Sequence, residues 1–219
     1  MKRHIIFDFD DTLSPSYELN QQLFVDTFTP FFPQIDQDYL RKFHYERRGT
    51  GMLEQFQDIV DKFSLDKSAK DLMQYNQKIH KTSAPKMNIF EGVENMLKHF
   101  KNRGKILSIC SNRDTKSLNI VLKKHKIDSY FQNTISCHSA GYDKPDPYCL
   151  NELLQKYPDI SSGETIYFGD SKTDADFASN ANIEYVIVDH YLNKKMFYHL
   201  ILESFGDSED SQILKRSLL

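Results

Sequence analysis

The chain has 219 residues, of which 39% are hydrophobic and 27% charged, and its formal net charge at pH 7 is −3. This mixture predicts a folded protein of one or two domains, and the slight negative charge argues against a dedicated nucleic-acid binder. No apolar run approaches the roughly 18–20 residues that span a bilayer, and the apolar stretch after Arg3 is too short for a signal peptide. The three cysteines form no CxxC pair, which predicts reduced, buried thiols. We therefore expect a cytoplasmic protein with neither a nucleic-acid nor a membrane partner.

Five short apolar runs, most of them followed directly by polar residues, are predicted to be strands. In chain order they are His4–Phe9, Lys105–Cys110, the weaker run Thr134–Cys137, Thr165–Phe168 and Tyr185–Val188. Continuous apolar character is typical of strands that are buried on both faces of a parallel sheet. Segments with helical spacing of apolar residues separate most of these runs. The alternation predicts an α/β fold, in which ligands bind beyond the carboxyl ends of the strands.

Residues 16–86 interrupt this alternation. The segment is rich in aromatic residues, has helix-like spacing and contains no convincing strand, and Ser14-Pro15 and Ala84-Pro85 bound it. We expect the aromatic residues to pack a core rather than to bind a cofactor. The expected organisation is a core made of residues 1–15 and 87–219, with an all-helical insertion over residues 16–86.

Three acids follow the first predicted strand. Asp8, Asp10 and Asp11 lie within four residues, and an extended chain places Asp8 and Asp10 on the same side. Two carboxylates this close repel each other, and burying both is costly unless a cation compensates them. The alternative is a solvated turn in which Asp11 or Thr12 caps a helix.

A second pair of acids follows the fourth predicted strand. Asp170 and Asp174 come after Gly169, and if this strand lies beside the first, four carboxylates meet at one edge of the sheet. Oxygen ligands without a cluster of His or Cys favour magnesium over zinc or copper. The alternative interpretation of Asp174 is an acid that stabilises the N-terminus of a helix.

Three further polar residues, in a loop and at the end of a strand, are candidates for the same site. Lys144 lies in a loop before a predicted helix, where it is either a fixed positive charge beside the acids or an ordinary exposed lysine. Ser111 and Asn112 end the second strand. They either donate hydrogen bonds to an anion or cap the helix that begins near Asp114.

In this order, the four segments resemble the motifs of the haloacid dehalogenase superfamily. The matching segments are Asp8–Thr12, the strand that ends in Ser111, Lys144–Pro147 and Gly169–Asp174. The insertion resembles the helical cap of the phosphoglycolate phosphatase-like branch. The resemblance implies a Rossmann-like parallel sheet flanked by helices, with an inserted all-α cap. Asp11 and Asn182 stand where the family usually has Gly, and Asn tolerates the left-handed backbone conformation.

The resemblance also implies a magnesium-dependent phosphatase that acts on a small phosphorylated metabolite. Asp8 would be the nucleophile that forms an aspartyl-phosphate, and Asp10 the general acid and base, its pKa raised by the like charges nearby. Ser111 and Lys144 would stabilise the transferring phosphoryl group. The implied magnesium ligands are Asp8, the main-chain oxygen of Asp10, Asp170 and, directly or through water, Asp174. The implied additional substrate-binding residues are Thr12 and Asn112.

Substrate selection is expected in the insertion. Arg47 and Arg48, before Gly49-Thr50-Gly51, either recognise an anionic group on the leaving side or form a solvated basic pair. Met52 stands where the mutases of this branch carry an Arg that binds a second phosphate, which argues against a mutase. A phosphomutase or other phosphotransferase, and a catalytically weak member that acts by binding a partner, remain the alternatives.

Overall fold

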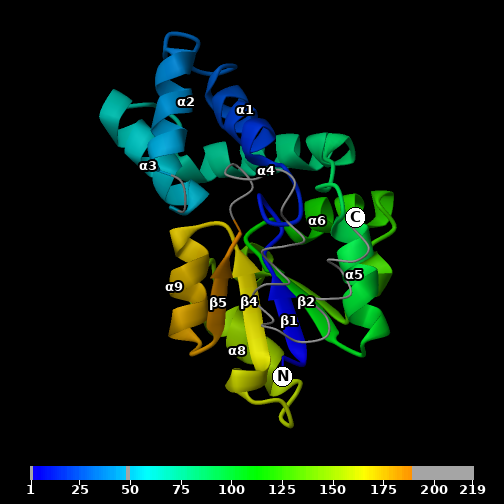
Figure 1. Cartoon of the computed structure of the whole chain (residues 1–219). Coiled ribbons are helices and arrows are strands. Elements are labelled where there is room, and N and C mark those ends of the chain that lie inside the picture. Colours follow the sequence, from blue (N-terminus) through cyan, green and yellow to red (C-terminus); the bar gives the residue numbers. More distant parts are fainter. Residues whose placement is uncertain (1, 48–49, 189–219) are drawn as a thin grey trace.

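The computed structural model describes residues 2–47 and 50–188, and in this part of the chain five parallel strands form one sheet (Figure 1). The order is β3-β2-β1-β4-β5, so the first strand lies in the centre. The strands are β1 (His4–Phe7), β2 (Ile106–Ser111), β3 (Asn133–Ser136), β4 (Thr165–Gly169) and β5 (Glu184–Ile187). All five predicted strands are confirmed. β1 ends two residues earlier than expected, so Asp8 follows the strand directly.

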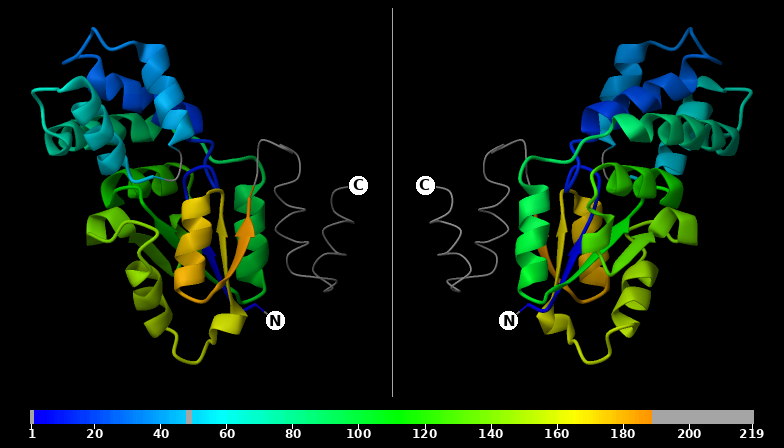
Figure 2. Two further views of the ribbon diagram at one scale, coloured as in Figure 1. Left: turned by 90° about the vertical axis from the view of Figure 1, so that its left-hand side faces the viewer. Right: turned by 90° about the vertical axis from the view of Figure 1, so that its right-hand side faces the viewer.

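Helices cover both faces of the sheet, as the α/β prediction requires (Figure 2). One face packs against α5 (Val93–Asn102) and α6 (Thr115–Lys124), and the other against α8 (Tyr148–Gln155) and α9 (Lys172–Asn180). The shorter elements are α7 (Cys137–Ala140), η1 (Ala84–Lys86), η2 (Asp128–Tyr130) and η3 (Ser162–Glu164).

The apolar residues of β1 supply both of these cores. Ile5 and Phe7 belong to the cluster on the α5–α6 face, whereas Ile6 belongs to the cluster on the α8–α9 face. This alternation of side chains explains why the strand is apolar throughout. The three cysteines are free and buried, as predicted, and no helix in the described residues is long and apolar enough to cross a membrane.

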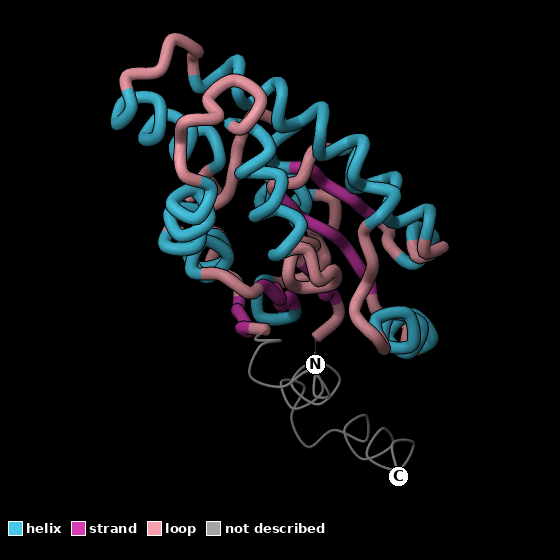
Figure 3. The backbone as a smooth tube through the Cα atoms, turned by 90° about the horizontal axis from the view of Figure 1, so that it is seen from above, coloured by secondary structure: helices cyan, strands magenta, loops and turns pink. Residues whose placement is uncertain are grey.

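Four helices of the inserted segment lie over the carboxyl ends of the strands (Figures 1 and 3). They are α1 (Tyr17–Phe28), α2 (Gln37–Glu46), α3 (Met52–Phe63) and α4 (Ala69–Ser83). Phe24, Phe28 and Phe56 are fully buried in a hydrophobic cluster that is formed by these helices and the loops between them. The prediction that the aromatic residues pack a helical core is confirmed for these three.

The chain leaves and re-enters the sheet region at adjacent points. The main-chain N–H of Phe90 donates to the carbonyl of Leu13 over 2.9 Å, and the hydroxyl of Ser14 donates to the carbonyl of Asn88 over 2.7 Å. The two segments that connect the helical insertion to the sheet are therefore bonded to each other.

Candidate active site

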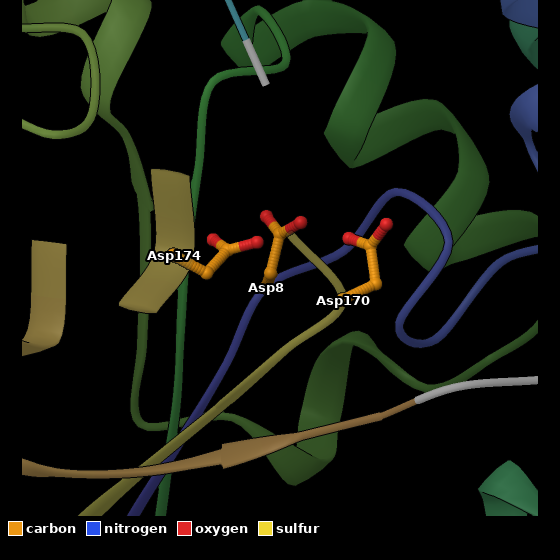
Figure 4. Close-up of side chains that lie close together, drawn as sticks. All are labelled: Asp8, Asp170 and Asp174. Carbon is orange, nitrogen blue, oxygen red and sulfur yellow. The ribbon is translucent and has the colours of Figure 1, made fainter. Parts of the chain in front are cut away.

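Strand register brings the first and last acidic motifs together. Phe7 of β1 is paired with Phe168 of β4, and the N–H of Asp8 donates to the carbonyl of Phe168 over 2.8 Å. Carboxylate oxygens of Asp8, Asp170 and Asp174 all lie within 4.8 Å of one another. In Figure 4 the carboxyl group of Asp8 stands between the other two. The predicted convergence of acids at this edge of the sheet is confirmed.

Lys144 reaches into the acidic cluster and is buried. Its Nζ lies 2.8 Å from Asp8 Oδ1, 2.6 Å from Asp174 Oδ1 and 3.2 Å from the hydroxyl of Tyr167. Burial lowers the pKa of Lys144, but the charges of Asp174 and Asp8 outweigh burial and hold this pKa above its ordinary value. Lys144 is therefore the fixed positive charge of the two alternatives, and not an exposed loop lysine.

Asp174 caps a helix, as the alternative interpretation expects, and also belongs to the acidic cluster. Its Oδ2 accepts hydrogen bonds from the N–H of Ser171 over 3.2 Å and from the hydroxyl of Ser171 over 2.5 Å, which caps helix α9. Its Oδ1 faces Lys144 at the same time. A Cβ atom on Gly169 would lie 2.5 Å from Asp174, so this approach of helix to strand requires glycine.

The negative charges of the acids at the centre of this site are not fully compensated by the nearby cations. Burial raises the pKa of Asp8 to about 7, and burial together with the charge of Asp8 raises the pKa of Asp170 to about 9. These carboxylates hold full negative charge at neutral pH only when a cation compensates them. Their oxygen-only donor set suits magnesium, so the residues present fit the predicted ion.

Asp10 is paired with Arg113, a residue that we did not single out in the sequence. Nε of Arg113 donates to both carboxylate oxygens of Asp10 over 3.1 and 2.9 Å, and Nη2 donates to Oδ1 over 2.6 Å. Burial raises the pKa of Asp10, but the charge and hydrogen bonds of Arg113 outweigh burial, so the net shift is downward. The prediction that like charges raise this pKa is wrong, because it omitted a buried cation.

Asp11 turns the chain toward the first helix of the insertion. It adopts the left-handed conformation with φ 52°, which explains the family's preference for Gly at this position. Its Oδ1 accepts hydrogen bonds from the N–H groups of Ser16 and Tyr17 over 3.1 and 2.8 Å. Asp11 therefore accepts hydrogen bonds from the first N–H groups of helix α1, although the N-cap residue itself is Ser16. Asn182 is also left-handed, with φ 55°, as expected.

Ser111 and Asn112 line the cavity above the acids. Ser111 is buried, and its Oγ accepts a hydrogen bond from the N–H of Arg113 over 3.2 Å. Asn112 Oδ1 accepts the N–H of Lys144 over 2.8 Å, which ties the lysine loop to the end of β2. Asp114 caps helix α6 by accepting the N–H of Ser117, so neither Ser111 nor Asn112 is needed as a cap.

A cavity of about 200 Å³ contains most of the predicted site residues. Its lining includes Asp8, Asp10, Ser111, Asn112, Lys144, Asp170 and Asp174. Two of the site residues predicted from the sequence are not found in the lining of this cavity. Thr12 is fully buried and does not line this cavity, and Arg47 instead forms ion pairs of 3.0 Å with Glu54 and 2.5 Å with Asp58. Arg48 lies outside the described residues.

Sequence reasoning also missed Tyr167, a fully buried residue of β4. Its hydroxyl lies 3.0 Å from the carbonyl of Cys110 and 3.1 Å from Asp174 Oδ1. Nothing in an apolar run distinguishes a tyrosine that reaches a site from one that only packs. Arg113 did carry a signal, because it is a basic residue one position after the two polar residues that end β2.

Comparison with known proteins identifies the family. Residues 5–188 match the model of the haloacid dehalogenase-like hydrolases. The chain belongs to this family. It is 34% identical over 107 residues to the phosphoglycolate phosphatase of Vibrio cholerae serotype O1, and the match covers 49% of this chain and 45% of that protein. The chain thus spans less than half the length of this curated relative.

Two further similarities extend over most of the chain. Pyrophosphatase PpaX of Bacillus cereus (strain Q1) is 23% identical, with 96% of this chain and 94% of that protein covered. YfnB of Bacillus subtilis, a provisionally assigned hydrolase of the same family that was solved with magnesium bound, superimposes with a TM-score of 0.66. The two chains are 15% identical over 88% of this chain and 91% of YfnB, which supports the fold assignment.

Proposed function

We propose that this protein is a magnesium-dependent phosphatase that hydrolyses a small phosphorylated metabolite through an aspartyl-phosphate. The observation that carries the proposal is the meeting of Asp8, Asp170, Asp174 and Lys144 in one cavity that Asp10 also lines. Family membership and the two curated relatives, which are named as phosphatases, support this reaction class.

The nucleophile and the proton carrier have separate places in this cavity. A carboxylate oxygen of Asp8 attacks phosphorus, and the bond from phosphorus to the leaving oxygen breaks while the carboxyl group of Asp10 protonates that oxygen. Water then attacks the aspartyl-phosphate, Asp10 takes its proton, and phosphate leaves. Arg113 favours the ionised form of Asp10, which takes the proton from water, and the proton gained in that step is the one that Asp10 gives to the leaving oxygen of the next substrate.

Lys144, Ser111 and the metal ligands prepare the site for a phosphate dianion. Lys144 and the hydroxyl of Ser111 face the position of the transferring group and stabilise its charge. Asp8, Asp170, Asp174 and the main-chain oxygen of Asp10 would hold magnesium, which supplies the charge that lets an anion approach a carboxylate. When ionised, the motif carboxylates Asp8, Asp10, Asp170 and Asp174 exceed the charges of Lys144 and Arg113 by two, and Asp11 also lines the cavity, so the site favours a divalent cation.

A hydrolase is favoured over a mutase by the side chain at the start of α3. Met52 lines the cavity at the position where the mutases of the branch carry an Arg. A thioether cannot hold a second phosphate group as a guanidinium does. The product is therefore expected to be free phosphate rather than an isomer of the substrate.

Release of phosphate from a panel of phosphate esters tests the proposal. We expect turnover with Mg²⁺, none with a chelator, and a loss of at least about 10⁴-fold for Asp8→Asn with the fold intact by circular dichroism. Asp159→Asn, an exposed carboxylate far from the cavity in sequence and contacts, is the matched control. An isomeric product without phosphate release would indicate the mutase, and no turnover of any ester with any divalent metal would indicate a binding protein.

A further inference from the structure

A second cavity, of about 190 Å³, adjoins the first one on the side of Asp10. The two cavities share five lining residues, which are Asp10, Asn20, Thr50, Met52 and Asn112. Since the proposed proton donor stands at their junction, a phosphate ester attacked by Asp8 places its leaving group in the second cavity. The lining of this leaving-group cavity then decides which alcohols are accepted.

Most of the leaving-group cavity is neutral. Its lining combines hydroxyl and carboxamide groups with two thioethers: Thr50, Asn76, Gln77, Asn112, Met52 and Met73. Carboxamides both donate and accept hydrogen bonds, as alcohol groups do, and methionine adapts to small apolar surfaces. These groups suit a compact, hydroxylated ligand.

Arg113 is the one permanent cation in the described lining, and its hydrogen-bonding capacity is used. Two of its nitrogens bind Asp10, and Nη2 also donates to Asn20 Oδ1 over 3.0 Å. Nη1 donates to Ser117 Oγ over 3.0 Å and faces His80 Nδ1 at 3.4 Å. A guanidinium has five N–H groups, so none remains for an anionic ligand.

The histidines of this lining add no unpaired positive charge. Burial and the nearby Arg113 lower the pKa of His80 to about 3, so its ring is neutral. His138 has a raised pKa because its Nδ1 bonds Asp143 over 3.2 Å, and that carboxylate balances its charge. Asp114 also lines the cavity and has no ion-pair partner among the described residues. The described lining thus holds two carboxylates, Asp10 and Asp114, against one permanent cation, and the charge of His138 is paired with Asp143 outside the lining.

We propose that this cavity selects phosphate esters of small uncharged polyols over phosphates whose leaving group carries a carboxylate or a phosphate. The inference rests on the proposed function and deepens it. It separates this chain from what its relatives' names imply, because phosphoglycolate and pyrophosphate both release anionic leaving groups. An anion in the leaving-group cavity would face Asp114, and each cationic side chain of the described lining is already bonded to another carboxylate.

A matched pair of ligands tests the selection. Phosphoglycolate and 2-hydroxyethyl phosphate differ only in a carboxylate against a hydroxymethyl group. Their dissociation constants are measured by calorimetry on Asp8→Asn with Mg²⁺, and their kcat/KM values on the unmodified protein. We expect the diol ester to be favoured at least about fivefold in both measurements. Equal or tighter binding of phosphoglycolate, or no binding of either ester, overturns the inference.

The two readouts separate the inference from the proposed function. If the unmodified protein releases phosphate from neither ester nor from the wider panel, the proposed reaction fails, while the ratio of dissociation constants still decides the selectivity. If it releases phosphate but favours phosphoglycolate, the reaction stands and the selectivity fails.

A charge-removing variant then locates the selectivity. Asp114→Asn keeps a good helix cap and removes the negative charge, so it is expected to move the ratio several-fold toward phosphoglycolate. Asp159→Asn removes the same charge from an exposed site paired with Arg3 and is expected to leave the ratio unchanged. An unchanged ratio for Asp114→Asn, or an equal change in both variants, overturns the assignment of Asp114.

Discussion

The two adjoining cavities differ in how many charged side chains line them. In the first, Lys144 pairs with Asp8 and Asp174, Arg113 pairs with Asp10, and the acids still carry an excess of negative charge. In the second, neutral side chains dominate, and the one permanent cation of the described lining is fully bonded. The contrast teaches that the proposed reaction uses segments at strand ends, whereas the proposed selection uses residues contributed mainly by the helices and loops around them.

Removing the lysine at the centre of the first cavity is expected to have the largest effect. Lys144→Met leaves Asp8 and Asp174 buried without their partner, so it should lower the free energy of unfolding by about 3–5 kcal/mol and abolish turnover. Lys172→Met, which breaks an exposed pair with Asp176, should cost less than about 1 kcal/mol. Chemical denaturation measures both, and similar losses in the two variants would contradict the buried pairing.

Removing Arg113 tests how its charge controls the pKa of Asp10, the residue that lines both cavities. Arg113 holds the pKa of Asp10 down, so Arg113→Met raises that pKa, and Asp10 then takes up a proton at higher pH than before. Because Asp10 must be ionised to accept a proton from water in the second step, the acidic limb of the pH–rate profile for hydrolysis of the aspartyl-phosphate should move to higher pH. Arg113→Lys keeps a positive charge and should shift the limb less. A limb that stays in place in Arg113→Met would remove Asp10 from the role of base.

Replacing Gly169 by alanine adds one carbon atom beside Asp174 and should lower stability and turnover by an intermediate amount. The Cβ of Gly169→Ala would meet Asp174 at 2.5 Å, so helix α9 has to shift, at a cost of about 1–3 kcal/mol. Turnover should fall together with stability, because Asp174 also holds Lys144. Gly163→Ala meets no atom closer than 3.8 Å and is the control. Thermal unfolding that is unchanged in Gly169→Ala would show that the helix adjusts freely.

Replacing Arg47 by alanine is expected to have the smallest effect on activity and stability. Its guanidinium bonds Glu54 and Asp58 on α3 and does not line either cavity, so Arg47→Ala should leave the ratio of kcat/KM between the two test esters unchanged. Loss of these partly exposed pairs should cost about 1 kcal/mol or less. A changed substrate ratio would favour the alternative in which Arg47 recognises an anionic group of the substrate.

The sequence predicted the first cavity better than the second for a physical reason. Asp8, Lys144 and Asp170 lie in short motifs at the ends of predicted strands, and parallel strands bring such ends together. The pairing of Asp10 with Arg113 depends on the direction of one long side chain, which spacing does not encode. For the same reason the sequence left open whether Arg47 faces the substrate, whereas in the structure Glu54 and Asp58 of the neighbouring helix bind it.

The hydrogen bond between Phe90 and Leu13 has a consequence for how this protein is assembled. The chain departs from the sheet region and returns to it at positions that already touch, so the path of the strands is complete without the helices in between. A short turn in place of those helices would preserve the connectivity of the sheet. Recombination could therefore exchange the insertion for another one, giving the same reaction centre a new substrate range.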